Sequence, residues 1–495
     1  MPASDTKVMS RANRPSGLAH APPHRRCQAA PRGCRTAVGT LRGVHEGLGR
    51  EPQHKIGSVL KQEENELITR VGPGTPMGNF MREYWMPAML SSELPASDSD
   101  PVRVLLLGEK LIAFRDTNGN VGLMDHNCPH RGASLFFARN EECGIRCVYH
   151  GWKFDAAGNC IDMPNEPAES DFKTRVKAKA YPTRERGGIV WGYLGPRKKP
   201  PPLPDLEGNM LPGAQAWAYQ QDANWFQILE GHIDTAHVSF LHYGGIQPQD
   251  VPPGSFSEYQ LRQRSAHFEV IDTEGGAAYA ARRPAAGGQV YWRIAQYIFP
   301  SFTMAPPGVL GLGKRNACEV PLDDEHTMTY QMSVSRGRPG GNGPNATMNP
   351  IAMQPRTTDW YGRWRPIVQP DNDFLIDREA QRNNAGPNGY TGITGIAMQD
   401  AAVTSSMGAI YDRRKEHLGT SDAMVIRVRR RVIAAIKAHM QYGSVPPGVD
   451  HPAAYRVRSG GVLLPEGADW VESTRELRKA FVDHPGLDPA LNGPL

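Results

Sequence analysis

The chain of 495 residues is long enough for two or three domains rather than one. Its 39% hydrophobic and 22% charged residues are ordinary for a globular protein, and no uninterrupted apolar run approaches the roughly 18 residues of a membrane span. The formal net charge of +5 arises in residues 1–58, which hold ten Lys and Arg against three Asp and Glu. Since the remainder is close to neutral, we do not expect it to bind nucleic acid. Since no apolar run is long enough to span a membrane, we do not expect a membrane protein.

Residues 1–58 are rich in Ala, Pro, Arg and Gly and lack apolar periodicity. Such a segment cannot bury enough surface to fold alone, so we expect a disordered basic extension. It lacks the apolar core of a secretory signal, and its Pro and Gly weaken an organelle transit peptide. An alternative is that it is not translated, because the text from Val59 reads as a natural beginning. The odd count of seven cysteines argues against a disulfide framework, so we expect a soluble cytoplasmic protein with free thiols.

The first half of the chain predicts short strands. Residues 72–95 predict a short helix closed by prolines. Four apolar runs bounded by Gly, Asp and Asn then predict strands: 102–108, 110–116, 121–125 and 187–195. The region from about 80 to 198 therefore indicates a small β domain. The Pro-rich stretch 198–208 is the preferred domain boundary.

The second half mixes helices and strands. Residues 224–242 predict a helix, and three strands follow: 268–272, 277–283 and 290–299. The Gly/Asn/Pro stretch 336–350 indicates an exposed loop, and apolar spacing predicts a helix over 421–440 whose RVRRR run is a solvated face. We therefore expect an α+β protein with two folded parts, 59–198 and 199–495.

The β domain carries two short Cys/His pairs. Cys128-x-His130 and Cys147-x-x-His150 are separated by the sixteen residues between His130 and Cys147. Sulfur and imidazole ligands suit an iron–sulfur cluster or zinc. Structural zinc usually uses wider spacings within each pair, so zinc fits less well. In a Rieske [2Fe–2S] cluster two His replace two Cys on one iron, which is the ligand set present here.

The pattern C-x-H…C-x-x-H followed by Gly151-Trp152 resembles the Rieske signature. Rieske subunits of respiratory complexes usually carry one more Cys in each cluster loop, and the two form a disulfide. Neither loop offers that pair here, so we expect Cys143 to be an unpaired thiol, and the oxygenase type of Rieske domain is the better match. The resemblance implies four cluster ligands: Cys128, His130, Cys147 and His150.

A second constellation, N-W-x-Q-x-x-E-x-x-x-D-x-x-H-x-x-x-x-H, runs from Asn224 to His242. Taken alone, two His on a helix are more often structural than metal-binding. A separation of five residues turns the two rings about 140° apart, so the helix must distort or end near His242 for His237 and His242 to reach one ion. Two imidazoles and a carboxylate are the ligands of non-haem Fe(II) oxygenases. Composition leaves several carboxylates open: Asp250, Asp371, Asp373 and Asp412.

Downstream of a Rieske-like region, this string resembles the iron site of ring-hydroxylating oxygenase α subunits, most closely the phthalate-dioxygenase-like branch. The match runs from about residue 59 to about residue 439. The resemblance implies that His237 and His242 are iron ligands and that Asp400, in ITGIAMQDAAVTSSMG, is the carboxylate ligand. Relatives often have Glu five residues after that Asp, where this chain has Ser405.

The same resemblance implies that Asp234 links the iron site to a Rieske His of the neighbouring subunit. We assign Asp234 and Asn224, at the head of the string, to the catalytic site. For a carboxylated substrate we expect an arginine, whose fork matches a carboxylate. Arg293, on a predicted strand among apolar residues, is the first candidate, and Arg282 and Arg283 come next.

As the resemblance implies, we expect the oxygenase component of a head-to-tail homotrimer with a helix-grip-like catalytic domain, an antiparallel sheet with flanking helices. Its cofactors are a [2Fe–2S] cluster and a mononuclear Fe(II), with O2 as cosubstrate and electrons from NAD(P)H through a separate FMN/ferredoxin-type reductase. The substrate is an aromatic carboxylate that is hydroxylated. One alternative is monohydroxylation or O-demethylation of a methoxylated aromatic acid. Another is a Rieske electron carrier, against which the additional 300 or so residues count.

Overall fold

The computed structural model describes residues 59–167, 169–334, 351–384 and 388–492, all within the unit Lys55–Leu495. The disordered extension expected at 1–58 and the loop expected at 336–350 lie outside the described residues. In the part of the chain that the structure describes, no helix combines the length and apolarity that crossing a membrane requires.

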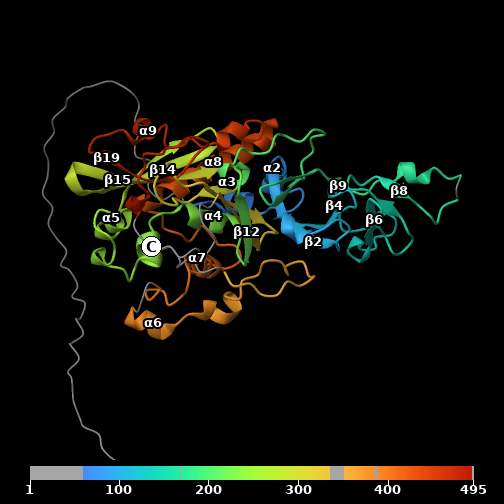
Figure 1. The fold of residues 1–495 in the computed structure, drawn as a ribbon, viewed down its shortest axis with the longest axis horizontal. Coiled ribbons are helices and arrows are strands. Elements are labelled where there is room, and N and C mark those ends of the chain that lie inside the picture. The colour runs from blue at the N-terminus through green and yellow to red at the C-terminus, as the bar shows by residue number, and fades with distance from the viewer. Residues whose placement is uncertain (1–58, 168, 335–350, 385–387, 493–495) are drawn as a thin grey trace, which may run out of the picture. The chain divides into compact units, whose positions relative to one another are not determined.

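The first half of the chain forms three small antiparallel sheets (Figure 1). Their strand orders are β1-β11-β10, β2-β3-β4-β9 and β5-β6-β7-β8. The strands expected in this half are confirmed. The bounds are β1 Trp85–Leu90, β2 Val102–Leu106, β3 Glu109–Arg115, β4 Val121–Asp125, β5 Arg139–Glu141, β6 Gly144–Arg146, β7 Lys153–Phe154, β8 Cys160–Asp162, β9 Ala180–Tyr181, β10 Thr183–Arg186 and β11 Ile189–Tyr193.

The helix expected over 72–95 is shorter than predicted. It comprises α2 (Pro76–Arg82), which begins at a Thr75 cap with proline in its first turn. The chain then continues as β1, whose six residues are all buried and pair with β11. Pro87 within β1 is incompatible with a helix interior, so strand pairing replaces the helix there.

The second half is built on an antiparallel sheet of eight strands in the order β12-β18-β17-β16-β15-β14-β13, with β19 paired to β15. The bounds are β12 Ala214–Gln221, β13 His267–Asp272, β14 Gly276–Pro284, β15 Gln289–Ile298, β16 Phe302–Met304, β17 Arg315–Pro321, β18 Thr327–Val334 and β19 Gly460–Pro465. The α-helices of the described chain are α1 Gln62–Thr69, α2, α3 Glu207–Met210, α4 Trp225–Ile233, α5 Phe256–Arg262, α6 Arg378–Asn383, α7 Ile396–Ser405, α8 Ala423–Tyr442 and α9 Trp470–Ser473.

The two faces of this sheet pack against different partners. Helices α4 and α8 lie on one face, against β13 to β17, and their apolar side chains share the main core with Tyr279 and Ala281 of β14. The intervening residues Ala278 and Ala280 face the other side and pack with Trp292 and Trp470. A large antiparallel sheet with helices packed on it confirms the α+β class (Figure 1). The division of the chain near residue 198 stays a prediction.

The predicted helix over 421–440 is confirmed as α8, which ends at Gly443 in the left-handed conformation. The expectation that its RVRRR run is a solvated face is wrong for Arg429. This guanidinium is 4% exposed and forms ion pairs with Glu230 and Glu416. One arginine of such a run can therefore point into the core when carboxylates there form ion pairs with it.

The last fifty residues, for which the sequence offered no motif, belong to the same sheet. Strand β19 pairs with β15, and just before it the buried Arg458 forms two hydrogen bonds, of 2.7 and 2.6 Å, with the buried Glu207. Arg458 also donates to the carbonyl oxygens of Gly311 and Val482. The segment therefore completes the sheet.

Three polar residues at every third position fix helix α4: Asn224, Gln227 and Glu230. The Asn224 side chain accepts from the Phe226 amide as the helix cap and donates to the carbonyl oxygens of Thr69 and Asp324. Gln227 donates to the carbonyl oxygens of Thr404, within the last turn of α7, and Gly408, just beyond its end. These bonds hold α4 against α1 and α7.

The third anchor of α4 is a buried ion-pair network. Glu230 forms ion pairs with Arg413, whose Nη2 lies 2.8 Å from Glu230 Oε2, and with Arg429 of α8. Burial alone would raise the pKa of Glu230, but the two guanidinium groups hold it below its usual value. The carboxylate therefore remains charged, and the three segments are tied together.

Replacing Glu230→Gln should lower the free energy of unfolding by about 3 kcal/mol, the low end for breaking a buried pair, because Arg429 keeps Glu416. Urea unfolding measures this change. The matched control is Glu472→Gln, which removes an exposed pair with Arg475 and should change stability by less than about 0.5 kcal/mol. Equal losses in the two variants would contradict the anchoring role.

Candidate metal centres

The two predicted cluster loops have the same backbone geometry. In each, the cysteine amide donates to the carbonyl five residues later, and the cysteine carbonyl accepts from the glycine amide four residues later. The first bond is 2.8 Å long in both loops and joins Cys128 to Ala133 and Cys147 to Trp152. The second bond is 2.9 Å long in both loops and joins Gly132 to Cys128 and Gly151 to Cys147. Both glycines have positive φ, 76° and 80°. Two equivalent turns thus present the four predicted ligands.

The side chains of these loops fit a cluster with two sulfur and two imidazole ligands. Cys128 and Cys147 are 2% and 3% exposed, whereas the rings of His130 and His150 are half-buried, with centroids 4.4 Å apart. Burial, together with the neighbouring thiol, raises the pKa of Cys128 to about 12. Two adjacent buried thiols ionise readily only beside a cation, which is what a cluster provides. The cluster role of these four residues stays a prediction.

His130 is held by a stacked tryptophan. Its ring lies 4.1 Å from that of Trp152 at an interplanar angle of 15°, and the Trp152 indole donates to Asn165 at 2.8 Å. Cys143 is a free cysteine, as expected, so no disulfide joins the two loops. The oxygenase type of loop is therefore present.

The helix expected over 224–242 is broken at Asp234, which has extended backbone angles (φ −82°, ψ 133°). The chain resumes as a π-helical turn, Val238–His242, with His237 in front of it. A π turn closes hydrogen bonds five residues apart, so side chains at that separation return to one side. The distortion expected near His242 is confirmed, and it brings the two His together.

Three predicted ligands converge. His237 Nε2 lies 3.2 Å from His242 Nε2, and the Oδ1 atom of Asp400 lies 3.5 and 3.2 Å from these two nitrogens. Among the described residues, this is the one group of three or more His, Cys, Asp and Glu whose ligand atoms all lie within 4.8 Å of one another. Burial would raise the pKa of Asp400, but the neighbouring histidines hold it below its usual value. The carboxylate comes from α7, and not from the other four candidates.

Each imidazole is oriented through its second nitrogen. His237 Nδ1 lies 3.1 Å from Asp234 Oδ2, and His242 Nδ1 lies 2.7 Å from Gln399 Oε1. Gln399 is itself held by its donation to the carbonyl oxygen of Ile393. An oxygen acceptor at Nδ1 favours the proton there and leaves Nε2 free for a metal. Gln399 was missed from the sequence, although it stands beside Asp400 in the quoted Q-D-x-A-V segment.

Asp234 also accepts from two backbone amides, those of Ala236 at 2.7 Å and His237 at 3.2 Å. Burial would raise its pKa, but the hydrogen bonds with His237 and these amides hold the pKa below its usual value. Its side chain is 23% exposed and that of His237 is 24% exposed, so both reach the surface.

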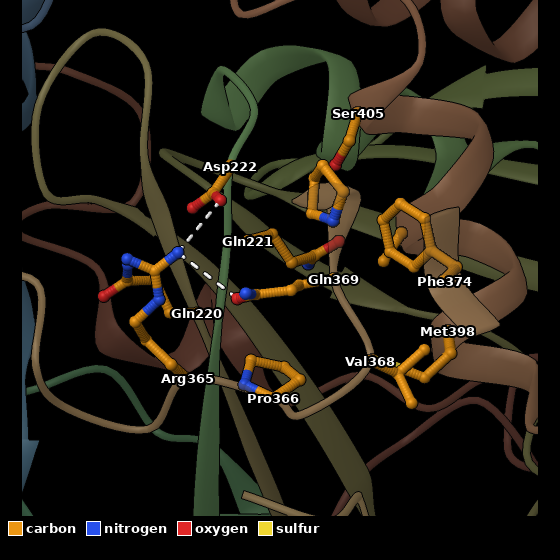
Figure 2. A pocket seen from close by; sticks show the side chains of 12 residues that line it. Gln220, Gln221, Asp222, Arg365, Pro366, Val368, Gln369, Phe374, Met398 and Ser405 are labelled. Carbon is orange, nitrogen blue, oxygen red and sulfur yellow. Dashed lines mark hydrogen bonds and ion pairs between the residues drawn. The ribbon is translucent and has the colours of Figure 1, made fainter. Parts of the chain in front are cut away.

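The other face of α7 lines a small pocket of mixed polar and apolar side chains (Figure 2). Figure 2 shows Arg365 between Asp222 and Gln369, and its Nη2 lies 3.3 Å from an oxygen of each. The cavity of about 20 Å³ has room for about one water beside Gln220, whose buried amide has no partner. No ligand of the triad lines it, so it is separate from the metal centre.

Arg293 lies beside the triad. Its Nε donates at 2.6 Å to the hydroxyl of Thr235, the residue after Asp234. Asn224 lies at the opposite end of α4, with its side chain engaged in the helix cap, and Arg282 is exposed. The structure thus gathers five of the predicted residues, Asp234, His237, His242, Asp400 and Arg293, while a catalytic role of Asn224 stays a prediction.

Two family models match the chain. One describes a Rieske [2Fe-2S] domain and matches residues 84–182. The other, described as LigXa C-terminal domain like, matches residues 193–488, more than half of the chain.

Known relatives align over most of their own length. The chain is 45% identical over 420 residues to the 3-chlorobenzoate-3,4-dioxygenase oxygenase subunit of Comamonas testosteroni, covering 82% of this chain and 96% of the relative. It is 38% identical over 431 residues to the phthalate 4,5-dioxygenase oxygenase subunit of Pseudomonas putida, covering 83% and 94%. The crystal structure of dicamba monooxygenase bound to dicamba is 18% identical, with a TM-score of 0.49, covering 73% of this chain and 99% of that one.

Gly151→Ala should lower the cluster content more than Gly132→Ala. Both glycines have left-handed backbone, which costs another residue about 1–2 kcal/mol. A Cβ at Gly151 would also lie 2.6 Å from the ring of Pro164, whereas at Gly132 the nearest atom is 3.9 Å away. Acid-labile sulfide and visible absorption per chain measure the cluster. Equal loss in both variants would mean that the contact with Pro164 is irrelevant.

Gln399→Leu should weaken iron binding at the triad about 10–100-fold, because His242 loses the acceptor that orients it. Iron retained against a chelator, counted per chain beside unchanged sulfide, measures the effect. Ser405→Ala on the same helix, whose hydroxyl has no partner, is the matched control. If both variants keep their iron alike, Gln399 does not orient the ligand.

Proposed function

The chain belongs to the Rieske aromatic ring-hydroxylating oxygenases, as a catalytic (α) subunit, and on that premise we propose that it hydroxylates an aromatic carboxylate. The observation that carries the substrate class is Arg293. This half-buried guanidinium lies beside the iron ligands, and no described carboxylate lies within ion-pair distance of it. A buried charge needs a partner, and a substrate carboxylate supplies one.

The residues of the site have different proposed roles. His237, His242 and Asp400 hold the mononuclear iron, and Cys128, His130, Cys147 and His150 would hold the cluster. When bound, the iron activates O2 and the cluster supplies electrons one at a time. Arg293 and Thr235 would position the carboxylate, so that the ring lies next to the triad.

The buried tyrosines around Arg293 would keep water out of the substrate site. Tyr243, Tyr279 and Tyr291 are all less than 5% exposed, and each lies close enough to Arg293 to influence its pKa. An enclosed site strengthens the attraction between the guanidinium and a carboxylate. It also limits side reactions of activated oxygen with water.

A separate reductase of the FMN/ferredoxin type would deliver the electrons, and a head-to-tail homotrimer would carry them from the cluster of one subunit to the iron of the next. Asp234, part-exposed and bonded to His237, would link the iron site to a cluster histidine of the neighbouring subunit. Exposed apolar side chains support this contact. They lie on the cluster side (Phe137, Val148, Tyr149 and Phe172) and near the triad (Phe240, Val403 and Met407).

Two alternative functions can be distinguished from the proposed one. Monohydroxylation or O-demethylation of a methoxylated aromatic acid would use the same residues, and product analysis separates it from dihydroxylation. An electron carrier without oxygen chemistry would need no second metal site, so the triad of His237, His242 and Asp400 argues against it.

Metal analysis of wild type and His237→Ala tests the proposal. We expect three irons and two acid-labile sulfides per chain, falling to two irons in the variant, because the triad loses one ligand while the cluster loops are untouched. EPR of the reduced protein should show the cluster signal in both. Wild type should also consume O2 with aromatic carboxylates, and the variant should not.

Two irons in both proteins, or zinc in place of iron, would rule out the oxygenase mechanism. If the protein contains three irons per chain but consumes no O2 with any aromatic carboxylate, the metal sites are supported and the proposed substrate class is rejected.

A further inference from the structure

A histidine–glutamate pair lies between α4 and β17, near the metal ligands. His232 Nδ1, in the last turn of α4, lies 2.6 Å from Oε1 of Glu319. Glu319 is completely buried, and its two carboxylate oxygens accept hydrogen bonds from the hydroxyl groups of Thr303, at 3.2 Å, and Thr329, at 2.8 Å. These bonds hold the carboxylate in one orientation, and the carboxylate in turn orients the imidazole ring.

The second ring nitrogen of His232 is available for chemistry. Its Nε2 atom makes no hydrogen bond with the described residues, and the side chain is 15% exposed. His232 and Asp400 are close enough for the charge of each to change the pKa of the other. His232 is not among the three residues whose ligand atoms converge. The imidazole therefore lies near the iron site without being a ligand.

Four charged or titratable groups surround this imidazole. Burial alone would lower the pKa of His232, but the negative charges of Glu319 and Asp400 raise it above its ordinary value. The guanidinium group of Arg315, on β17, acts in the opposite direction. Burial raises the pKa of Tyr219, on β12, so that this phenol stays neutral. An imidazole paired with a carboxylate in this way holds a proton near neutral pH.

The proposed reaction needs protons. Hydroxylation with one O2 takes up two electrons and two protons, whether both oxygen atoms enter the product or one leaves as water. Asp234 and Asp400 have pKa values below the carboxyl range, and burial raises the pKa of Tyr243 and Tyr279. Arginine does not release its proton. Apart from the metal ligands, His232 is therefore the described group near the triad that can release a proton at neutral pH.

We propose that His232 is a proton donor of the oxygenation reaction and that Glu319 is its positioning residue. This inference rests on the proposed function and goes beyond it by naming the acid. The N–H bond at Nε2 breaks, its electron pair stays on the nitrogen, and the proton passes to an oxygen atom that electrons from the cluster have reduced. Water, which reaches the part-exposed ring, supplies the second proton and returns the first to His232. Glu319 stabilises the imidazolium before the transfer.

The first test measures product formation in a single turnover of the reduced holoenzyme, with O2 and an aromatic carboxylate that wild type hydroxylates. His232→Gln should slow product formation about 100-fold or more, because a positioned acid contributes about 10²–10⁴-fold. Iron content and the dissociation constant of the substrate should stay within about twofold, because His232 is not a metal ligand. Glu319→Gln, which removes the charge but keeps a hydrogen-bonding group, should slow the reaction about tenfold.

The matched control is His326→Gln. His326 Nδ1 lies 2.9 Å from Asp323 Oδ1 in the turn between β17 and β18, so it forms the same kind of pair. The rate of product formation should be that of wild type, because none of the contacts of His326 involves the triad.

A second readout does not depend on activity. In protein with histidine labelled at Cε1 and zinc in place of the mononuclear iron, NMR follows the titration of His232. Its signal is identified by its loss in His232→Gln. The pKa of His232 should lie above the ordinary value of 6.5 and should fall in Glu319→Gln, because the imidazolium loses its counter-charge.

Three outcomes would overturn the inference while the proposed function stands. The first is product formation in His232→Gln at the wild-type rate. The second is a slower rate that an equal loss of iron or of substrate affinity explains, which indicates a structural role. The third is a pKa of His232 that Glu319→Gln leaves unchanged, which rejects the positioning role of Glu319. If wild type hydroxylates no aromatic carboxylate, the proposed function is rejected instead, and this inference with it.

Discussion

The carboxylate of Glu230 lies between the guanidinium groups of Arg413 and Arg429, and the iron site depends on this buried network. The iron ligands come from two distant stretches of chain, the turn after α4 and helix α7. They meet only if α4 is held in one position against the segment after α7 and against α8. Gln227 adds bonds to the end of α7. Asn224, Gln227 and Glu230, which precede the iron ligands in the sequence, therefore hold helix α4 in place.

The break of the helix at Asp234 is the second constraint. A regular helix would carry His237 and His242 on different sides, and the extended residue followed by a π turn brings them together. The same carboxylate accepts from the amides that follow the break and from the His237 ring. Backbone geometry and ligand orientation therefore have one cause, and substitution at Asp234 affects both.

Buried charge distinguishes the anchors of the fold from the residues of the site. Glu230 and Arg413, and likewise Glu207 and Arg458, form buried pairs with short hydrogen bonds. Such pairs specify how distant segments meet, since breaking one leaves an uncompensated charge. Arg293 lies in the same sheet, half-buried and without a carboxylate partner among the described residues. Under the proposed function, the carboxylate of the substrate is the partner of Arg293.

The sequence by itself determined what lies within a few residues: the two Cys/His pairs, the His237/His242 pair, helix α8 and seven of the nineteen strands of the described chain. Local spacing is enough there, because a tight loop or a single turn leaves little freedom. Only the tertiary structure selected Asp400 by geometry, identified Gln399 as the partner of His242, placed Arg429 in the core, bonded Asn224 to the carbonyl oxygen of Thr69 and joined β19 to β15. These contacts join segments more than a hundred residues apart or depend on which face of an element is covered, and packing decides both.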